Sequence, residues 1–224
     1  MNLLDLIFPK RCVACGRFGS YLCENDEKKI TGAKSFCPMC LKAAIGGTTH
    51  PKCKGKLSLD GLICLFDYST PVKEIIHELK YRFVKDLQEV ARVQLKKSKR
   101  LEQLDLRFFT LIPIPLSYAR KNWRGFNQTE ILGKLVAQKL KIPFASDILA
   151  RTKDTKPQVK LLRKERIRQA KGAFQVGDPK RTPGKNFLVF DDVWTTGATL
   201  KETTAVLKRK GASRVWGLTL ASPH

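Results

Sequence analysis

From Gly61 onward, the chain alternates short apolar runs with segments in which apolar residues recur every three or four positions. Runs without polar alternation are typical of strands buried on both faces, as in parallel sheets, and the periodic segments predict amphipathic helices. Alternation of the two kinds predicts an α/β fold built on a twisted parallel sheet. The segments that carry this pattern are 62–68, 71–81, 87–101, 108–113, 127–140, 187–190, 199–209 and 215–220.

The helical segments carry signals for their ends. Pro71 follows Thr70 and suits the first turn of a helix, where a missing N–H costs no hydrogen bond. Gly211 follows the periodic segment 199–210, at a position where a left-handed cap is wanted. These two residues therefore predict the start of one helix and the end of another.

The first 58 residues differ from the rest, because they hold little apolar sequence and most of the cysteines. Six of the seven cysteines lie between Cys12 and Cys53. The sequence therefore predicts two units, a small module over residues 1–58 and a larger α/β domain over residues 59–224. The seventh cysteine, Cys64, lies in an apolar run and is expected to be a small core residue of a strand.

Pairs of candidate metal ligands separated by two residues occur four times in the N-terminal module. A tight turn of this spacing points two side chains at one tetrahedral Zn²⁺, so that two such turns complete a structural site. Sequential pairing predicts two zinc ions, one on the first two pairs and one on the last two. A crossed pairing, in which the Cys-x-x-Cys pairs share one ion, stays open. In chain order the pairs are Cys12/Cys15, Cys23/Asp26, Cys37/Cys40 and His50/Cys53.

Asp26 is the weakest of these candidate ligands, because a hard carboxylate is less usual beside three thiolates. An exposed acid with no metal explains Asp26 equally well. Sets of four protein ligands leave no open position for catalysis, so both sites are expected to be structural. Metal would then supply much of the folding free energy of a module that has little apolar core.

The charge of the chain suggests a class of partner. Its 43 Lys and Arg against 20 Asp and Glu give a formal net charge of +23. Such an excess attracts polyanions, although a generally basic surface with no such partner explains it as well. No apolar stretch approaches the roughly 20 residues of a membrane span. Since the first ten residues also lack the features of a signal peptide, a cytoplasmic protein is expected.

The chemistry concentrates in residues 187–199, where an apolar run is followed by Asp191 and Asp192. Carboxylates at the carboxyl end of a parallel strand face a crevice, where they can accept hydrogen bonds from the two hydroxyls of a ribose. The turn that follows leads into a helix, whose first N–H groups can hold a phosphate together with the threonine hydroxyls. The segment therefore predicts a site for a ribose 5-phosphate. The turn consists of Thr195, Thr196, Gly197, Ala198 and Thr199.

Residues 187–199 resemble the thirteen-residue PRPP-binding signature of type I phosphoribosyltransferases. No Gly-x-x-x-x-Gly-Lys-Ser/Thr occurs, which disfavours a Walker-type ATPase. Further motifs make the chain similar to the ComF family of competence-associated proteins with this fold, in which zinc ribbons often precede it. The chain departs from that family at Asp26, at His50 and at Gln169. The motifs are Tyr68, Ile76, 79–81, Ile112-Pro-Ile-Pro115, 124–128, Arg151-Thr152, Gln158 and 171–174.

The resemblance implies Mg²⁺-PRPP, or another ribose 5-phosphate, as the ligand of residues 191–199. It also implies that a turn formed by Pro113, Ile114 and Pro115 meets the pyrophosphate. Three basic residues are close enough in sequence to add charge there: Arg120, Lys121 and Arg124. The segment 151–171 is expected to form a mobile loop over the polyanion, with Arg151, Thr152, Gln158 and Arg166 as candidate contacts. No acid or base is assigned, since positioning and electrostatics do most of the catalysis in phosphoribosyl transfer.

Two functions are compatible with these features. The ComF resemblance implies a PRPP-binding protein that handles single-stranded DNA during DNA uptake and natural transformation, with proteins of the competence machinery as further partners. Basic segments with aromatic residues, such as 118–126 and 107–109, could contact phosphates and stack bases, although core packing explains Phe108 and Phe109 at least as well. The alternative is an active phosphoribosyltransferase with a small-molecule acceptor and no DNA role. Since no acceptor motif is recognisable, enzymatic activity stays undecided.

Overall fold

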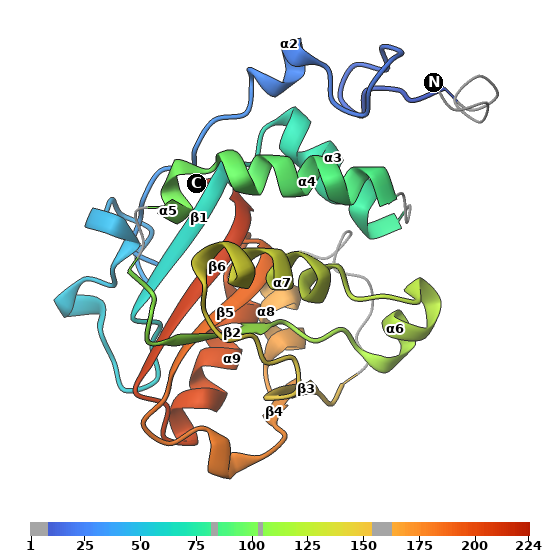
Figure 1. The fold of residues 1–224 in the computed structure, drawn as a ribbon. Helices are drawn as coiled ribbons and strands as arrows, with labels where there is room; N and C mark the ends of the chain where they lie inside the picture. The colour runs from blue at the N-terminus through green and yellow to red at the C-terminus, as the bar shows by residue number, and fades with distance from the viewer. Residues whose placement is uncertain (1–8, 82–84, 103–104, 154–162) are drawn as a thin grey trace.

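The computed structural model describes residues 9–81, 85–102, 105–153 and 163–224. Its centre is a four-stranded sheet in the order β1-β6-β5-β2, in which every neighbouring pair is parallel (Figure 1). The predicted α/β class with a parallel sheet is therefore confirmed. The strands are β1 (Gly61–Asp67), β2 (Phe109–Pro113), β5 (Asn186–Val193) and β6 (Arg214–Ser222). A separate antiparallel pair joins β3 (Leu149–Arg151) to β4 (Phe174–Val176).

Helices cover both faces of this sheet (Figure 1). One face carries α3 (Thr70–Tyr81), α4 (Lys85–Lys97), α5 (Lys99–Glu102) and α7 (Gln128–Leu140). The other carries α9 (Ala198–Arg209), and α8 (Arg163–Ala170) packs against α9. A short helix, α6 (Tyr118–Arg124), lies between β2 and α7 in the chain. The periodic segment 87–101 falls on two helices, which are separated at Ser98.

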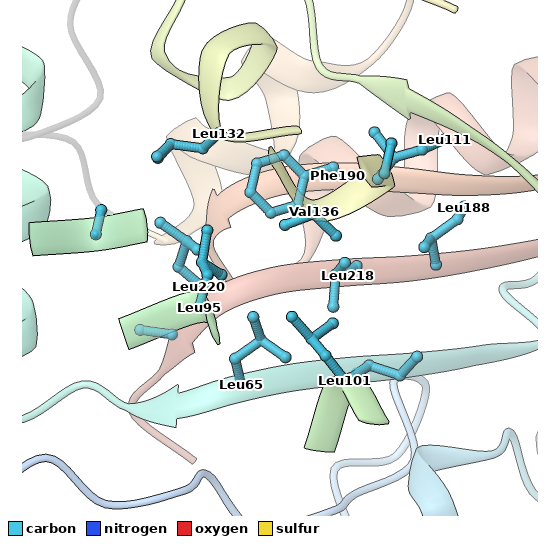
Figure 2. Packing of buried hydrophobic residues seen from close by; sticks show 14 of the residues in the cluster. Leu65, Leu95, Leu101, Leu111, Leu132, Val136, Leu188, Phe190, Leu218 and Leu220 are labelled. Atoms are coloured by element: carbon cyan, nitrogen blue, oxygen red, sulfur yellow. The ribbon is translucent and has the colours of Figure 1, made fainter. Parts of the chain in front are cut away.

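Alternate residues of β5 point to opposite faces, which explains why the strand is apolar throughout. Leu188 and Phe190 belong to a cluster with Leu132 and Val136 of α7, as Figure 2 shows. The intervening residues, Phe187 and Val189, belong to a second cluster that includes residues of α9. All four β5 side chains are at most 2% exposed. The second cluster also contains Cys64, which is the core residue of a strand that the sequence predicted.

The N-terminal residues contain little regular structure. They include α2 (Glu24–Glu27) and two short 3₁₀ turns, η1 (Ile45–Gly47) and η2 (Pro51–Cys53). Thr31 and Ala33 run along the free edge of β1, where Thr31 O accepts from the backbone N–H of Asp67 at 2.9 Å. This pairing covers an edge strand that would otherwise present unpaired N–H and C=O groups. The expected limit between the two units at residue 58 stays a prediction.

Within the described residues, none of the helices combines the length and the apolar character that crossing a bilayer requires.

Candidate functional site

A cavity of about 500 Å³ opens at the carboxyl ends of β2 and β5. Ligands of open parallel sheets bind at this edge, and the volume is typical of small-molecule sites, which span about 300–1,000 Å³. The end of β5, the turn that follows it and the first turn of α9 form one wall. The other lining residues are Tyr68, Lys80, Ile114, Pro115, Leu116, Trp123, Gln128, Thr129, Arg151 and Arg166.

The two acids stand at the end of β5. The strand does not stop at Phe190, because Asp191 still pairs with Thr219 of β6, so both acids keep extended backbone. The Asp192 carboxylate accepts a hydrogen bond from the Lys80 ammonium at 2.7 Å and another from the Gln128 amide at 3.3 Å. The Asp191 carboxylate accepts from the backbone N–H of Asp192 at 2.9 Å. The pair is therefore oriented by groups from α3 and α7 as well as by its own strand.

The electrostatics of the two acids differ. Burial, together with the neighbouring Asp192 carboxylate, raises the pKa of Asp191 to about 7. Burial alone would lower the pKa of Lys80, but the Asp192 carboxylate outweighs it and the pKa of Lys80 is raised. Lys80 therefore stays charged beside Asp192, and the Asp191 carboxyl titrates near neutral pH.

The turn after β5 has the backbone geometry of an anion site. Gly197 has φ of 70° and precedes the first residue of α9. A Cβ at this position would lie 2.1 Å from a ring atom of Trp194, so only glycine fits the turn. Trp194 lies beneath the turn and is 1% exposed. The first N–H groups of α9, a helix of 12 residues, are thereby presented to the cavity, where they favour a phosphate.

The structure brings some of the expected binding residues to this cavity and leaves others outside it. Besides Asp191, Asp192 and the turn 195–199, the lining includes Ile114, Pro115, Arg151 and Arg166. Pro113 is the last residue of β2 and does not line the cavity, and neither do the exposed Lys121 and Thr152. Arg120 and Arg124 lie on α6, and Gln158 lies outside the described residues.

Other lining residues were given no role from the sequence. Lys80 and Gln128 occur in the family motifs, yet only the structure shows that they meet Asp192. The available signal was that Lys80 lies one helical turn after Ile76, on the buried face of α3. Thr129 fixes the opposite wall, since its hydroxyl donates to the carbonyl of Ile114 at 2.7 Å.

The second group of candidate metal ligands consists of Cys37, Cys40, His50 and Cys53. Their ligand atoms all lie within 4.8 Å of one another. His50 Nε2 is 3.0 Å from the carbonyl of Ala43, which leaves Nδ1 facing the sulfurs, 3.4 Å from Cys40 Sγ. Burial favours the neutral thiol, but backbone hydrogen bonds from Cys40, His50 and Met39 lower the pKa of Cys37 to about 7. Three sulfurs and an imidazole oriented in this way fit a tetrahedral Zn²⁺.

The first group consists of Cys12, Cys15, Cys23 and Asp26, and its ligand atoms also lie within 4.8 Å of one another. Asp26 is only 3% exposed, so its description as an exposed acid is wrong. Its Oδ2 lies 3.2 Å from the sulfurs of Cys12 and Cys23, and its Oδ1 accepts from Lys29 at 2.7 Å. The hydrogen bond to Cys15, followed by that to Lys29, lowers the pKa of Asp26. The two groups are separate, as sequential pairing requires, and each can hold a metal ion.

Comparison with known proteins identifies relatives along the whole chain. No family model matches it. Competence protein F of Haemophilus influenzae is 31% identical over 229 residues, which cover 96% of this chain and 98% of that protein. DNA utilization protein YhgH of Shigella flexneri is 30% identical, with 92% of each chain covered. Competence protein ComFC of Bacillus subtilis is 29% identical, with 89% of this chain and 82% of that protein covered. This chain therefore belongs to the ComF family.

Solved structures with a partly similar arrangement include the following two. An allosteric regulatory enzyme of purine biosynthesis has a TM-score of 0.41 and 16% identity, covering 64% of this chain and 30% of that one. A hypoxanthine phosphoribosyltransferase of Staphylococcus aureus has a TM-score of 0.37 and 13% identity, covering 60% of this chain and 64% of that one. Because both scores are below 0.5, the fold class rests on the sheet itself and not on these likenesses.

Proposed function

We propose that this protein binds Mg²⁺-PRPP, or another ribose 5-phosphate, in the cavity at the end of β5, and that it handles single-stranded DNA in the cytoplasm during DNA uptake and natural transformation. The observation that carries the proposal is the meeting of the Asp191–Asp192 pair and the turn 195–199 in one cavity. The names of the relatives, which are competence and DNA utilization proteins, support the role with DNA. The formal net charge of +23 supports a polyanionic partner.

In this proposal the turn 195–199 holds the 5′-phosphate through backbone N–H groups and hydroxyls, and the acids accept hydrogen bonds from the ribose hydroxyls. Ile114 and Pro115 lie on the opposite wall, where the pyrophosphate is expected. Arg151 and Arg166 also belong to the lining and can meet its charge. Mg²⁺ bound with the ligand would neutralise the pyrophosphate further. The α6 cations and the segment 151–171 remain candidate contacts, and both cysteine groups are proposed to hold structural Zn²⁺.

The ribose site is tested by replacing both acids with their amides. Charge-assisted hydrogen bonds are worth roughly 1.5–3 kcal/mol each, so Asp191→Asn with Asp192→Asn should weaken Mg²⁺-PRPP binding by about tenfold or more. Calorimetry on the wild type and the double variant measures this loss. Unchanged affinity in a folded double variant would refute the assignment.

The proposed DNA surface lies on α6, beside the cavity. Tyr118 and Trp123 are 75% and 69% exposed, and Lys121 is also exposed. Exposed aromatic side chains next to cations are typical of surfaces that stack bases and neutralise phosphates of single strands. The sequence could not separate Phe108 from Phe109, but the structure does: Phe109 is buried in the core and Phe108 is 80% exposed. Since Trp123 also lines the cavity, excess Mg²⁺-PRPP is expected to compete with DNA.

Salt dependence tests this surface. For single strands, log K falls with log salt by about 0.7 per phosphate neutralised, so Lys121→Gln should flatten the slope as well as weaken binding. Trp123→Ala should cost roughly 1–3 kcal/mol of binding with little change in slope. Lys180→Gln is a matched control, because Lys180 is exposed on the turn before β5, at the opposite end of the strand from the cavity. Anisotropy that shows no DNA binding at low salt would overturn the DNA role.

A second candidate function is phosphoribosyl transfer to a small acceptor without any role with DNA. It is favoured by the apolar wall of the cavity, where Leu116 and Trp123 could contact a planar acceptor beside the proposed ribose site. PRPP-dependent release of pyrophosphate, measured with bases, nucleotides and DNA as acceptors, distinguishes the two functions. Release with a small acceptor by a protein that does not bind DNA would favour the transferase.

A further inference from the structure

Lys80 is a lysine on the buried face of a helix. It follows Ile76 and Leu79, which pack in the core cluster on the face of the sheet that α3, α4 and α7 cover. The Lys80 side chain is only 24% exposed. A lysine in such a position loses hydration, which is costly unless the charge is paired. Its partner is Asp192, whose side chain is 13% exposed and whose carboxylate lies 2.7 Å away. The ion pair therefore reaches from α3 into the wall of the cavity.

Lys80 and Gln128 both bind the same oxygen, Oδ2 of Asp192. Two donors from two different helices fix the plane of this carboxylate. The Asp191 carboxylate uses Oδ1 to accept the backbone N–H of Asp192. Among the described residues, the remaining oxygens, Oδ1 of Asp192 and Oδ2 of Asp191, accept no hydrogen bond. The pair thus keeps one acceptor oxygen on each acid for a ligand.

Two adjacent carboxylates in a partly buried site repel one another, so a cation is needed if they are to act as acceptors. A divalent ion bound with the ligand is one source of that charge. Lys80 is another, because its ammonium is a compact point charge that can donate three hydrogen bonds. Its place is fixed by the fold, whereas a divalent ion must arrive with the ligand.

We propose that Lys80 is the resident cation of the ribose subsite: it holds Asp192 as a hydroxyl acceptor, so that the sugar hydroxyls bind without a divalent ion. Lys80 is then a positioning residue that acts through Asp192. This inference rests on the proposed ribose site. It adds that a sugar phosphate without pyrophosphate needs no divalent ion to bind.

The test uses ribose 5-phosphate as the probe, in Mg²⁺ and in EDTA, with calorimetry on the full chain. The wild type should bind it equally in both buffers and should prefer it over 2-deoxyribose 5-phosphate, which lacks one hydroxyl. Lys80→Met should bind ribose 5-phosphate about tenfold or more weakly in EDTA, as expected for a lost charge-assisted interaction. It should also lose the preference for ribose over deoxyribose, and Mg²⁺ should restore part of the affinity. Lys80→Arg, which keeps the charge, should retain most of the affinity in EDTA.

Lys134→Met is the matched control, since Lys134 is 57% exposed and pairs with Glu130 on the surface of α7. It should behave as the wild type does. Thermal unfolding separates a folding defect from a binding defect. If Lys80→Met is unfolded, the role of Lys80 is tested with Lys80→Gln and by comparing the wild type in Mg²⁺ and in EDTA. A wild type that binds ribose 5-phosphate only with Mg²⁺, or a folded Lys80→Met that binds and discriminates normally, would overturn the role of Lys80. A wild type that binds PRPP but shows no dependence on the two acids would instead overturn the proposed site.

Discussion

The two groups of candidate metal ligands have similar chemistry but are joined to the rest of the molecule differently. In the second group, Phe36 precedes the ligand Cys37 and packs against Trp194, with ring centroids 6.1 Å apart. Trp194 in turn lies beneath Gly197 in the turn that faces the cavity. His224 adds to this cluster, since its ring is 5.6 Å from that of Phe36 and its Nε2 is 3.3 Å from the carbonyl of Thr195. The second group is therefore one aromatic contact away from the proposed phosphate turn.

Backbone contacts strengthen this attachment. Thr48 forms an antiparallel bridge with Gly61, at the start of β1. Gly47 approaches β1 so closely that a Cβ there would lie 1.9 Å from the carbonyl oxygen of Leu62, and its φ of +76° also favours glycine. The second group thus shares both core and backbone pairing with the sheet.

The first group is attached to a helix that is away from the cavity. Glu27 of α2 accepts hydrogen bonds from Gln94 and Lys97 of α4, both at 2.6 Å. Tyr21 and Leu22 are only partly buried where they pack against the core. In Figure 1 the segment that carries α2 lies at the periphery, next to α3 and α4. Metal in the first group should therefore stabilise a surface attachment, whereas metal in the second should also stabilise the turn at the site.

The largest expected effect comes from making the same substitution, cysteine to serine, in each of the two groups and comparing the results. Cys53→Ser should remove the metal of the second group, unfold the segment around it and weaken ribose phosphate binding. Structural zinc in small peptides supplies about 10–16 kcal/mol of apparent binding free energy, so the loss should be severe. Cys23→Ser in the first group should remove the other metal and leave ribose phosphate binding within about twofold. Metal analysis of the wild type should give two zinc ions per chain, and equal losses of binding in the two variants would contradict the comparison.

A smaller effect is expected when the aromatic contact is removed and the ligands are kept. Phe36→Ala should retain both metals but cost about 3–5 kcal/mol of stability, as is usual for a buried phenylalanine. It should also weaken ribose phosphate binding several-fold, because Trp194 loses its support beneath the turn. Tyr21→Ala, next to the first group, is the control and should leave that binding unchanged. Normal binding by a folded Phe36→Ala would show that the second group does not act on the turn.

These contacts also show which features a sequence can predict. The four strands of the parallel sheet were predictable because burial on both faces makes them uniformly apolar, whereas the short pair of β3 and β4 was not predicted. The candidate ligands were predictable because each pair with two intervening residues is local. The acids and the turn are contiguous, so their grouping was visible too. The contacts of Lys80 with Asp192 and of Phe36 with Trp194 join residues that are far apart in the chain, and no spacing rule connects them. Pro113 was expected at the pyrophosphate turn, but it extends β2 by pairing with Phe190.

The pH dependence of stability should distinguish the ribose site from both metal groups. Burial raises the pKa of Asp191 from an ordinary value of 3.8 to about 7. Stability from the neutral acid is therefore fully present below about pH 4 and is lost as the pH rises through 7. The side chain at this position in the variant Asp191→Asn stays neutral at every pH. The free energy of unfolding of this variant, relative to that of the wild type, should therefore rise by about 2 kcal/mol between pH 5.5 and pH 8, at about 1.36 kcal/mol per pKa unit. Metal loss at low pH affects both proteins alike and cancels. Chemical denaturation at the two pH values measures the difference, and parallel curves would contradict the assigned environment of Asp191.

The smallest effect on the ribose site is expected from replacing Asp26, the only carboxylate of the first group, with a fourth cysteine. Asp26→Cys replaces a hard oxygen ligand with a soft one and should bind zinc more tightly, as judged by competition with a chelator. The gain is limited because Lys29, which holds Oδ1 of Asp26 at 2.7 Å, loses its partner. Asp26→Ala should lower zinc retention in the first group only. Neither substitution should change ribose phosphate binding, because, in the part of the chain that the structure describes, the segment of this group is hydrogen-bonded to α4 through Glu27 and not to the turn 195–199. A change in that binding would show that the first group is also coupled to the ribose site through the core. The two groups would then differ only in how strongly they affect that site.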